Sequence, residues 1–242
     1  MPSKKKPCRK HLPRGLDILY EDDAILVVRK PAGLLTMAAQ GSRDKTLYYV
    51  LTDYVRKGNP KSPRRVYIVH RLDQWTSGVL IFAKSEEAKL TLQSNWEQTE
   101  KKYMAVVWGR PTPDAGTISS YLAENKAFKV YSTNDPSKGK LSHTAYRVVR
   151  DNGRFSLVEI TLLTGRKNQI RVHLADKGCP IVGDRKYGMS KDTHRRLALH
   201  ARSISFKHPV DGRPMSFETP MPDELQRLMK KLRETEGAAS KN

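Results

Sequence analysis

The chain has 242 residues, of which 45 are Lys or Arg and 25 are Asp or Glu, so its formal net charge is +20. Hydrophobic residues make up 38% of the sequence, which is enough to bury a folded core. A positive excess of this size favours a polyanionic partner, of which nucleic acid is the usual one. The longest apolar runs, at residues 24–28 and 79–83, are far shorter than the roughly 18 residues of a membrane helix. The composition therefore excludes a membrane-spanning helical protein.

Cysteine usage and the N-terminal residues indicate the compartment. Cys8 and Cys179 lie far apart in the sequence and form neither a CxxC pair nor a disulfide framework. The N-terminal lysines and arginines are not followed by an apolar segment, so we expect no secretory signal. These features predict a protein of the reducing cytoplasm without a structural zinc site.

Charge and composition divide the chain into three parts. Residues 1–15 are predicted to be a basic, flexible arm, because lysines and arginines cluster there without acidic residues. Residues 237–242 are predicted to be a disordered end. No internal repeat or low-complexity linker interrupts the part between them, so residues 16–236 are predicted to form one domain.

Strand patterns dominate this domain, and three or four helices are predicted between them. Thr46, Ser85 and Asn168 are predicted helix N-caps, with the helices ending near Gly58 and Gly178 for the first and third. Pro222 is predicted to begin the last helix. The predicted strands cover residues 17–20, 24–28, 66–69, 78–83, 103–108, 143–150, 155–163 and 202–206. Strands joined by both short turns and helices predict an α+β fold with a large mixed, mostly antiparallel sheet flanked by helices.

The connection between the predicted strands 66–69 and 78–83 contains the first candidate site residue. Asp73 lies there, preceded by His70 and Arg71 and followed by a Thr-Ser-Gly turn. One interpretation is that its carboxylate caps the turn through the backbone amides near Thr76. The other is that Asp73 is a nucleophile or a base, which requires a nearby cation to keep it ionised.

A basic segment supplies candidates for that cation. Arg171 falls in the first turn of the helix predicted after residue 168, where Ile170 and Leu174 form the core-facing stripe. A helix fixes an arginine better than a loop does, so Arg171 is the preferred partner of a carboxylate. For Arg166 and Lys167 we prefer a phosphate-binding role, which a basic helix N-terminus favours.

The strand predicted at residues 103–108 begins with an aromatic side chain. Alternation places Tyr103 on one face with Ala105 and Val107. A strand tyrosine is more often a core residue, but a ring that faces a cleft can stack on a base and its hydroxyl can meet a proton. Both interpretations of Tyr103 remain open at this point.

Several segments together resemble the RluA-type family of RNA pseudouridine synthases, in the order that this family has. The resemblance covers about residues 16–222. The similar segments are Lys30-Pro31-Ala32-Gly33, His70-Arg71-Leu72-Asp73-x-x-Thr76-Ser77-Gly78, Lys102-Tyr103-x-Ala105, Gly165-Arg166-x-x-Gln169-Ile170-Arg171-x-His173, Pro180-Ile181-x-Gly183-Asp184-x-x-Tyr187-Gly188 and Leu199-His200-Ala201. Gln74 and Trp75 depart from the family's pattern, where a lysine and a small polar residue are more usual.

The resemblance implies a role for each candidate residue. Asp73 matches the catalytic aspartate, Tyr103 the tyrosine that packs on the target base, and Arg171 the arginine that pairs with the aspartate. Arg71 matches the residue that helps to displace the target nucleotide, and His70 the residue that shapes the catalytic loop. The residues expected to contact RNA are Arg71, His70, Arg166, Lys167 and Lys102.

The resemblance also implies a reaction. Such enzymes break the N1 to C1′ bond of a uridine, turn the uracil and rejoin it through C5, which needs neither a metal nor a nucleotide cofactor. We therefore expect a catalytic domain over residues 16–236 with a central RNA-binding cleft, without the accessory RNA-binding domain of many relatives. Ribosomal or transfer RNA is the expected substrate and a cytoplasmic monomer the expected state. The sequence leaves open whether Asp73 attacks or takes a proton from C2′.

Two other functions agree with the composition. One is a non-catalytic RNA-binding or ribosome-assembly protein of the same fold, in which Asp73 could be replaced without loss of function. The other is a basic protein that merely binds polyanions, which makes the joint presence of Asp73, Tyr103 and Arg171 a coincidence. The segments in register favour the enzyme.

Overall fold

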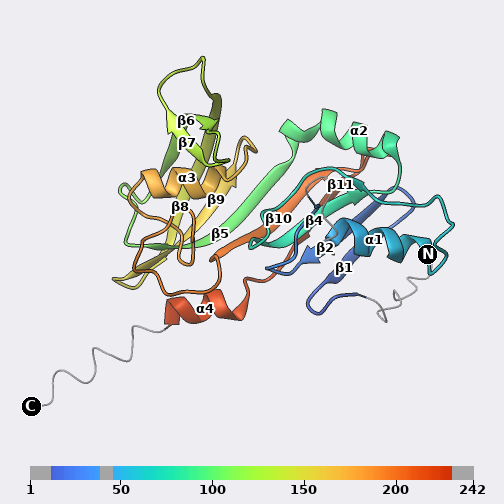
Figure 1. The fold of residues 1–242 in the computed structure, drawn as a ribbon, viewed down its shortest axis with the longest axis horizontal. Coiled ribbons are helices and arrows are strands. Elements are labelled where there is room, and N and C mark those ends of the chain that lie inside the picture. Colours follow the sequence, from blue (N-terminus) through green and yellow to red (C-terminus); the bar gives the residue numbers. More distant parts are fainter. Residues whose placement is uncertain (1–11, 39–45, 231–242) are drawn as a thin grey trace, which may run out of the picture. The chain divides into compact units, whose positions relative to one another are not determined.

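The computed structural model describes residues 12–38 and 46–230 (Figure 1). The predicted arm up to residue 11 and the predicted end at 237–242 lie outside the described residues. The chain divides into two compact units. The first comprises Met1–Gln98 and Ser205–Phe217, and the second comprises Thr99–Ile204 and Glu218–Asn242. The prediction of one domain over residues 16–236 stays a prediction.

The first unit is built around one strand that is buried along its whole length. That strand is β4, and it pairs antiparallel with β2 and also with the short β3, while β1 pairs with β2. Three helical segments and the β11 hairpin complete the unit. The bounds are β1 Asp17–Glu21, β2 Ile25–Lys30, α1 Leu47–Arg56, β3 Tyr67–Ile68, β4 Ser77–Ala83, α2 Glu86–Ser94, a 3₁₀ turn Trp96–Gln98 and β11 Pro214–Glu218, whose last residue belongs to the second unit.

Predicted caps fix the two helices of the first unit. The Thr46 hydroxyl accepts a hydrogen bond from the Tyr49 N–H at the start of α1. The Ser85 hydroxyl accepts one from the Ala88 N–H at the start of α2, and Ala88 and Leu92 are buried. Both N-caps predicted from the sequence are confirmed, because each side chain satisfies an amide that the helix leaves without a partner.

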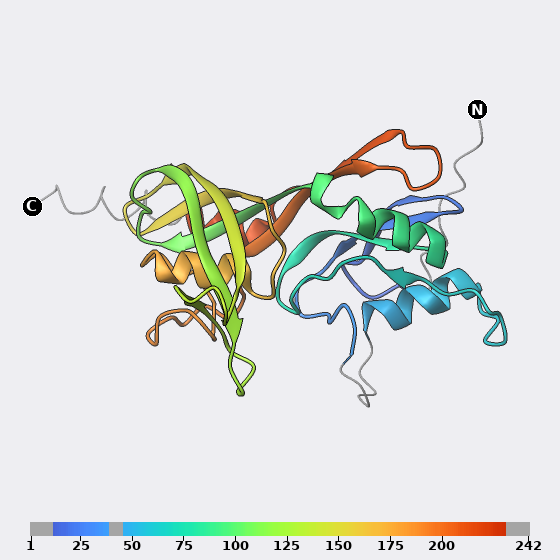
Figure 2. The same cartoon turned by 90° about the horizontal axis from the view of Figure 1, so that it is seen from above.

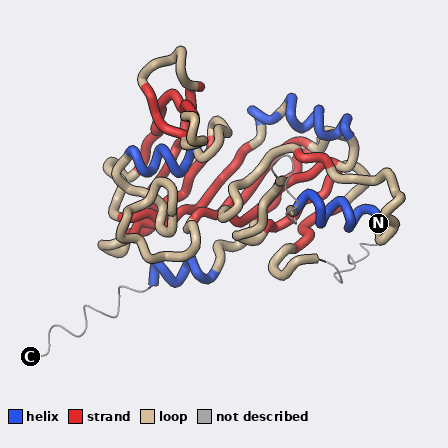
Figure 3. The backbone as a smooth tube through the Cα atoms, viewed as in Figure 1, coloured by secondary structure: helices blue, strands red, loops and turns tan. Residues whose placement is uncertain are grey.

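The strands of the second unit follow the order β10-β5-β9-β8-β6-β7 (Figure 1). Figure 3 shows the strands in red. The pairs β5–β9, β8–β9, β6–β8 and β6–β7 are antiparallel, so the predicted α+β class with a mostly antiparallel sheet is confirmed. The bounds are β5 Glu100–Trp108, β6 Ala115–Glu124, β7 Val130–Thr133, β8 Lys140–Asp151, β9 Phe155–Leu162, α3 Gln169–Asp176, β10 Leu199–Lys207, which ends in the first unit, and α4 Asp223–Lys230.

The predicted starts of the last two helices have different outcomes. Pro222 precedes α4, in which Leu225 and Met229 are buried. Asn168, however, does not cap α3: its backbone has φ +54° and its side chain makes no cap hydrogen bond. The helix ends at Asp176, near the predicted Gly178. Asn tolerates the left-handed conformation, and here its side chain bonds to other partners instead.

Within the described ranges, the structure has no candidate membrane-spanning helix, metal-binding group or cysteine pair. None of their helices is both long and apolar enough to cross a bilayer. Among the same residues, no group of three or more His, Cys, Asp or Glu side chains is placed to hold a metal ion. Cys179 is a free, buried cysteine.

Candidate active site

Asp73 lies on the connection between β3 and β4, and the residue before it is held by a buried hydroxyl. The Leu72 N–H donates to Thr36 Oγ1 over 3.3 Å, and the same hydroxyl donates to the Leu72 carbonyl oxygen over 2.9 Å. Thr36 and Leu72 are 2% and 6% exposed. The backbone immediately before Asp73 therefore has one fixed position in the unit.

The residue after Asp73 is held by a buried ammonium group. Lys30 is 0% exposed, and its Nζ donates to the Gln74 carbonyl oxygen at 2.9 Å, the Leu34 oxygen at 2.7 Å and the Pro31 oxygen at 3.0 Å. The Gly33 N–H also donates to the Gln74 oxygen, over 2.9 Å. A buried charge must be compensated by hydrogen bonds. Here those bonds join residues 31–34 to residues 69–76, the connection between β3 and β4 that we call the Asp73 connection.

A turn follows directly and presents an aromatic side chain. The Thr76 N–H donates to the Asp73 main-chain oxygen over 3.1 Å, so the main chain itself closes this turn. Trp75 is 46% exposed, and its ring would be 3.4 Å from a Cβ at Gly33, which has φ +90°. Both the conformation and the close ring favour glycine at position 33. Asp73 itself is half-buried.

His70 supports the connection from the other end. The Ile81 N–H donates to His70 Nε2 over 3.2 Å, and the His70 ring lies 4.5 Å from the Trp96 ring, centroid to centroid. These contacts fit the predicted loop-shaping role of His70. Arg71 is exposed and makes no hydrogen bond or ion pair to any residue in the described ranges.

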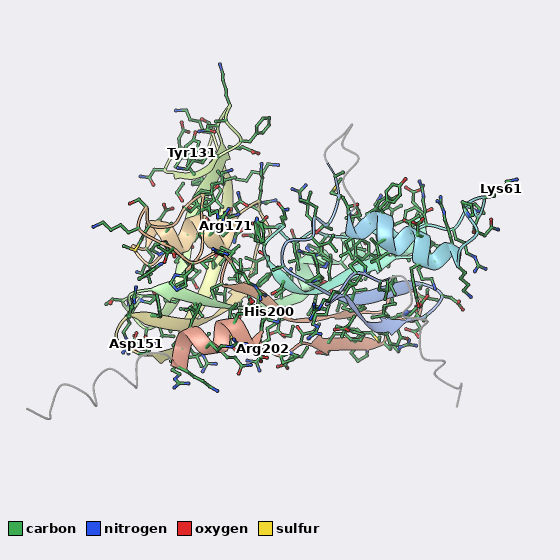
Figure 4. The ribbon with its side chains drawn as sticks, turned by 60° about the horizontal axis from the view of Figure 1, so that its bottom comes forward. Lys61, Tyr131, Asp151, Arg171, His200 and Arg202 are labelled. Carbon is green, nitrogen blue, oxygen red and sulfur yellow. The ribbon has the colours of Figure 1, made fainter. Side chains whose placement is uncertain are left out.

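Arg171 lies on α3 of the second unit (Figure 4). A buried carboxylate holds its guanidinium. Its Nε and Nη2 donate to the two oxygens of Asp184 at 2.7 and 2.8 Å. Its Nη1 donates to Asn168 Oδ1 at 3.2 Å, and the guanidinium carbon lies 5.1 Å from the centre of the Tyr187 ring. The Arg171 side chain is 14% exposed. The bidentate hydrogen bonding to Asp184 and the contact with the Tyr187 ring fix both the plane and the position of this guanidinium.

Asp184 is placed by a strand-like segment beside β5. The Trp108 N–H donates to the Pro180 oxygen and the Val182 N–H to the Val106 oxygen, at 2.9 Å each. Burial alone would raise the pKa of Asp184, but the Arg171 guanidinium and the amides of Tyr187 and Lys186 outweigh it and lower this pKa. The carboxylate therefore stays ionised beneath Arg171.

Two glycines give Asp184 its surroundings. A Cβ at Gly183, which has φ +77°, would lie 1.9 Å from the Arg196 oxygen, and a Cβ at Gly188 would lie 2.1 Å from the Asp184 oxygen. Neither position accepts a side chain without movement of the backbone. The Gly-Asp-x-x-Tyr-Gly segment is thus the support of Arg171, a role that the sequence analysis did not assign to it.

Buried polar groups anchor the N-terminal part of α3. Gln169 is 2% exposed; its Nε2 donates to the His143 oxygen and to Thr144 Oγ1, and its Oε1 accepts from the Arg166 N–H. His173 is 0% exposed, with Nδ1 2.9 Å from Thr144 Oγ1 and Nε2 3.0 Å from Ser120 Oγ. These bonds join α3 to β8 and β6. Sequence analysis missed this network, although polar residues at buried positions of a predicted helix were a signal for it.

The other predicted site residues of the second unit lie on β5 and before α3. Tyr103 is 8% exposed, so its ring is largely enclosed. Lys102 forms an ion pair with Glu100 at 3.1 Å. Arg166 and Lys167 are exposed, and the Lys167 ammonium pairs with Glu124.

The predicted site residues thus form two groups. His70, Arg71 and Asp73 lie on one connection of the first unit, and Lys102, Tyr103, Arg166, Lys167 and Arg171 lie in the second unit. The pairing of Asp73 with Arg171 and the packing of Tyr103 on a base stay predictions.

The chain is similar to known proteins in sequence and to solved structures in fold. An uncharacterized RNA pseudouridine synthase of Chlorobaculum parvum is 38% identical over 243 residues, covering 90% of this chain and 74% of that protein. Ribosomal large subunit pseudouridine synthase D of Zymomonas mobilis is 35% identical over 232 residues, covering 90% and 73%. The solved structure of human RNA pseudouridylate synthase domain containing 4 has a TM-score of 0.74 at 24% identity, covers 89% of this chain and 92% of that chain, and supports the fold. Residues 24–176 match the sequence profile described as RNA pseudouridylate synthase, and the chain therefore belongs to the family of RNA pseudouridine synthases.

Proposed function

We propose that this RNA pseudouridine synthase converts uridine to pseudouridine in ribosomal RNA and that Asp73 is its catalytic carboxylate. Similar proteins from Zymomonas mobilis and Xanthomonas campestris, at 35% and 36% identity, are described as ribosomal large subunit pseudouridine synthase D. Their described substrate supports the choice of ribosomal RNA. The net charge of +20 supports binding to a large polyanion.

The single observation that carries the role of Asp73 is the way in which its connection is held. Thr36 fixes the main chain of Leu72, and Lys30 and Gly33 fix the carbonyl oxygen of Gln74. A carboxylate that acts on a sugar or base needs a preset position, because misplacement by about 1 Å costs on the order of a hundredfold in rate. Two buried polar side chains flank one half-buried aspartate, which is more support than a surface turn requires.

Arg171 and Tyr103 complete the proposed site. The Arg171 guanidinium is held in place by Asp184 and Asn168, so it has a preset position in its unit. In the proposal, Arg171 pairs with Asp73 and keeps it ionised, while the Tyr103 ring packs against the uracil. Arg71, His70, Lys102, Arg166 and Lys167 are the proposed RNA contacts, and the enzyme acts as a cytoplasmic monomer.

The experiment that tests the proposal compares pseudouridines in ribosomal and transfer RNA from cells with and without this protein. Loss of a site in ribosomal RNA is expected, and it identifies the substrate and the position together. Loss confined to transfer RNA would replace the proposed substrate, and an unchanged map would refute the activity in these RNAs.

A purified Asp73→Asn variant tests the role of the carboxylate. The amide keeps the size but loses the charge, so product formation should cease while RNA affinity stays within a few-fold. Arg171→Met should show the same loss of product. Turnover by folded Asp73→Asn protein would contradict the catalytic role. Complementation of the cells by Asp73→Asn would instead favour the RNA-binding or ribosome-assembly alternative.

A further inference from the structure

The hairpin between β6 and β7 presents an aromatic ring to solvent. Its tip spans residues 125–129, and the hairpin extends beyond the rest of the second unit (Figure 1 and Figure 2). Phe128 at this tip is 72% exposed, although phenylalanine usually contributes to a core. The ring therefore adds little to the buried apolar surface of its unit.

The backbone at this position makes the choice of residue costly. Phe128 has φ +55°, a conformation that glycine usually occupies in short hairpin turns. The turn is nonetheless well fixed, because Asn125 Oδ1 accepts from the Ala127 and Lys129 amides at 3.0 and 2.9 Å. The Phe128 N–H also donates to the Asn125 oxygen over 2.9 Å. A strained, exposed, apolar residue in a rigid turn gives no folding benefit, which indicates a function.

Several lysines of the same unit lie on or near this hairpin tip. The Lys167 ammonium lies 5.6 Å from the Phe128 ring centre, and the Lys186 ammonium donates to the Phe128 carbonyl oxygen at 2.6 Å. Lys126 and Lys129 on the tip are exposed. Glu124 is the acidic residue here, and it pairs with Lys167. The surface formed by residues 124–129, Lys167 and Lys186 is thus positively charged around one exposed ring.

We propose that this surface, the Phe128 surface, binds RNA and that the Phe128 ring stacks on an unpaired base outside the target uridine. Lysines neutralise phosphates, while an aromatic ring offers a face for stacking to any base that is not already paired. The surface adjoins the proposed site, because Tyr187 contacts both Lys129, at 5.8 Å, and Arg171, at 5.1 Å. This inference rests on the proposed function and adds to it a contact that selects RNA with an unpaired nucleotide.

The test measures affinity for two labelled RNA probes, a short hairpin with a uridine-rich loop and a fully paired duplex of the same length. Phe128→Ala should weaken binding of the hairpin probe by about tenfold and leave binding of the duplex unchanged, because only the loop offers a base for stacking. Phe128→Trp should retain the affinity, and its additional indole fluorescence should be quenched by the hairpin probe.

A glycine variant separates the contact from the fold. Phe128→Gly removes the ring and also the backbone strain, so its melting temperature should equal or exceed that of the wild type while affinity for the hairpin probe falls. Tyr49→Ala, which removes a 63% exposed ring from α1 in the first unit, is the matched control and should bind both probes normally.

Distinct results overturn the inference and the proposed function. Unchanged affinity of Phe128→Gly for the hairpin probe, or equal losses for both probes or in Tyr49→Ala, would overturn stacking by Phe128. The first of these results would leave the ring to a protein partner. Pseudouridine formation by the wild type is assayed separately: its absence, with the Phe128 effect intact, would refute the activity and leave the RNA contact standing.

Discussion

Replacing Lys30 by Met tests whether the Asp73 connection depends on the buried ammonium group beneath it. Met has a similar length and fits an apolar core, so the change removes the charge and three donors without leaving a large cavity. The carbonyl oxygens of Pro31, Leu34 and Gln74 then lose the hydrogen bonds that they accept from Lys30.

The expected loss of stability is large. A buried acceptor left without its partner costs about 1–3 kcal/mol, and removal of one side of a buried charged interaction costs about 3–5 kcal/mol in total. We therefore expect Lys30→Met to lower the free energy of unfolding by about 3–5 kcal/mol, measured by urea denaturation. Lys61→Met, at an exposed position of the same unit, is the control and should change it by less than about 0.5 kcal/mol.

Catalysis should be affected as well, because Gln74 follows Asp73 directly. At a temperature where Lys30→Met is folded, we expect a slower rate of product formation with nearly unchanged RNA affinity, because the released connection no longer presets the carboxylate. A stability loss below about 1 kcal/mol together with a normal rate would refute the reasoning.

Three further predictions concern other residues. Asp184→Asn should lower the free energy of unfolding by about 3 kcal/mol in urea, because it removes the charge of one partner from a buried ion pair; an unchanged value would contradict the support role. Burial lowers the pKa of His173 to about 4. The unfolded chain therefore takes up a proton first as the pH falls from about 6.5 toward 4, and stability decreases over this range by up to about 3 kcal/mol. His173→Gln should flatten that decrease in urea titrations at several pH values, and an identical slope would argue against it. Arg71→Ala should slow the reaction by about tenfold on a structured RNA and much less on a short single strand, and equal losses would make Arg71 an ordinary phosphate contact.

The sequence predicted helix starts and buried strands where neighbouring residues alone determine them. Thr46 and Ser85 cap their helices as expected, and the apolar run at 79–83 is the buried strand β4. The strands β6 and β7 were not predicted, because β6 contains a glycine and two serines and much of it is exposed, so neither face shows a clear apolar alternation. Pairing with β8 stabilises this strand, and that pairing depends on residues distant in sequence.

In the candidate site, too, short segments could be interpreted from the sequence, whereas contacts between distant residues could not. Asp73 and Arg171 could be proposed as site residues from their segments, and that proposal stays a prediction, but the groups that hold them could not be predicted. Lys30 lies 44 positions before Gln74, and Asp184 lies 13 positions after Arg171. Nothing in the local sequence distinguishes a buried lysine from a solvated one, since the distinction is made by carbonyl oxygens that the fold brings together. The N-cap prediction for Asn168 was wrong for a related reason. Asn is a good capping residue, but here its side chain bonds to Tyr187 and Arg171, which the local sequence does not reveal.

The contacts of Arg171 fit the geometry of a guanidinium. Asp184 accepts two parallel N–H bonds from one edge of the guanidinium, Asn168 accepts a third, and the Tyr187 ring contacts the group. A lysine ammonium would be a point charge that could neither form the two-point bond nor lie flat against the ring. Folding therefore orders the guanidinium before any RNA binds. Because the ordering is complete, a carboxylate that meets this arginine gains its electrostatic effect without further loss of side-chain freedom. In the proposed site, the buried groups of Asp184 and Lys30 would thus set the positions of Arg171 and of the main chain beside Asp73.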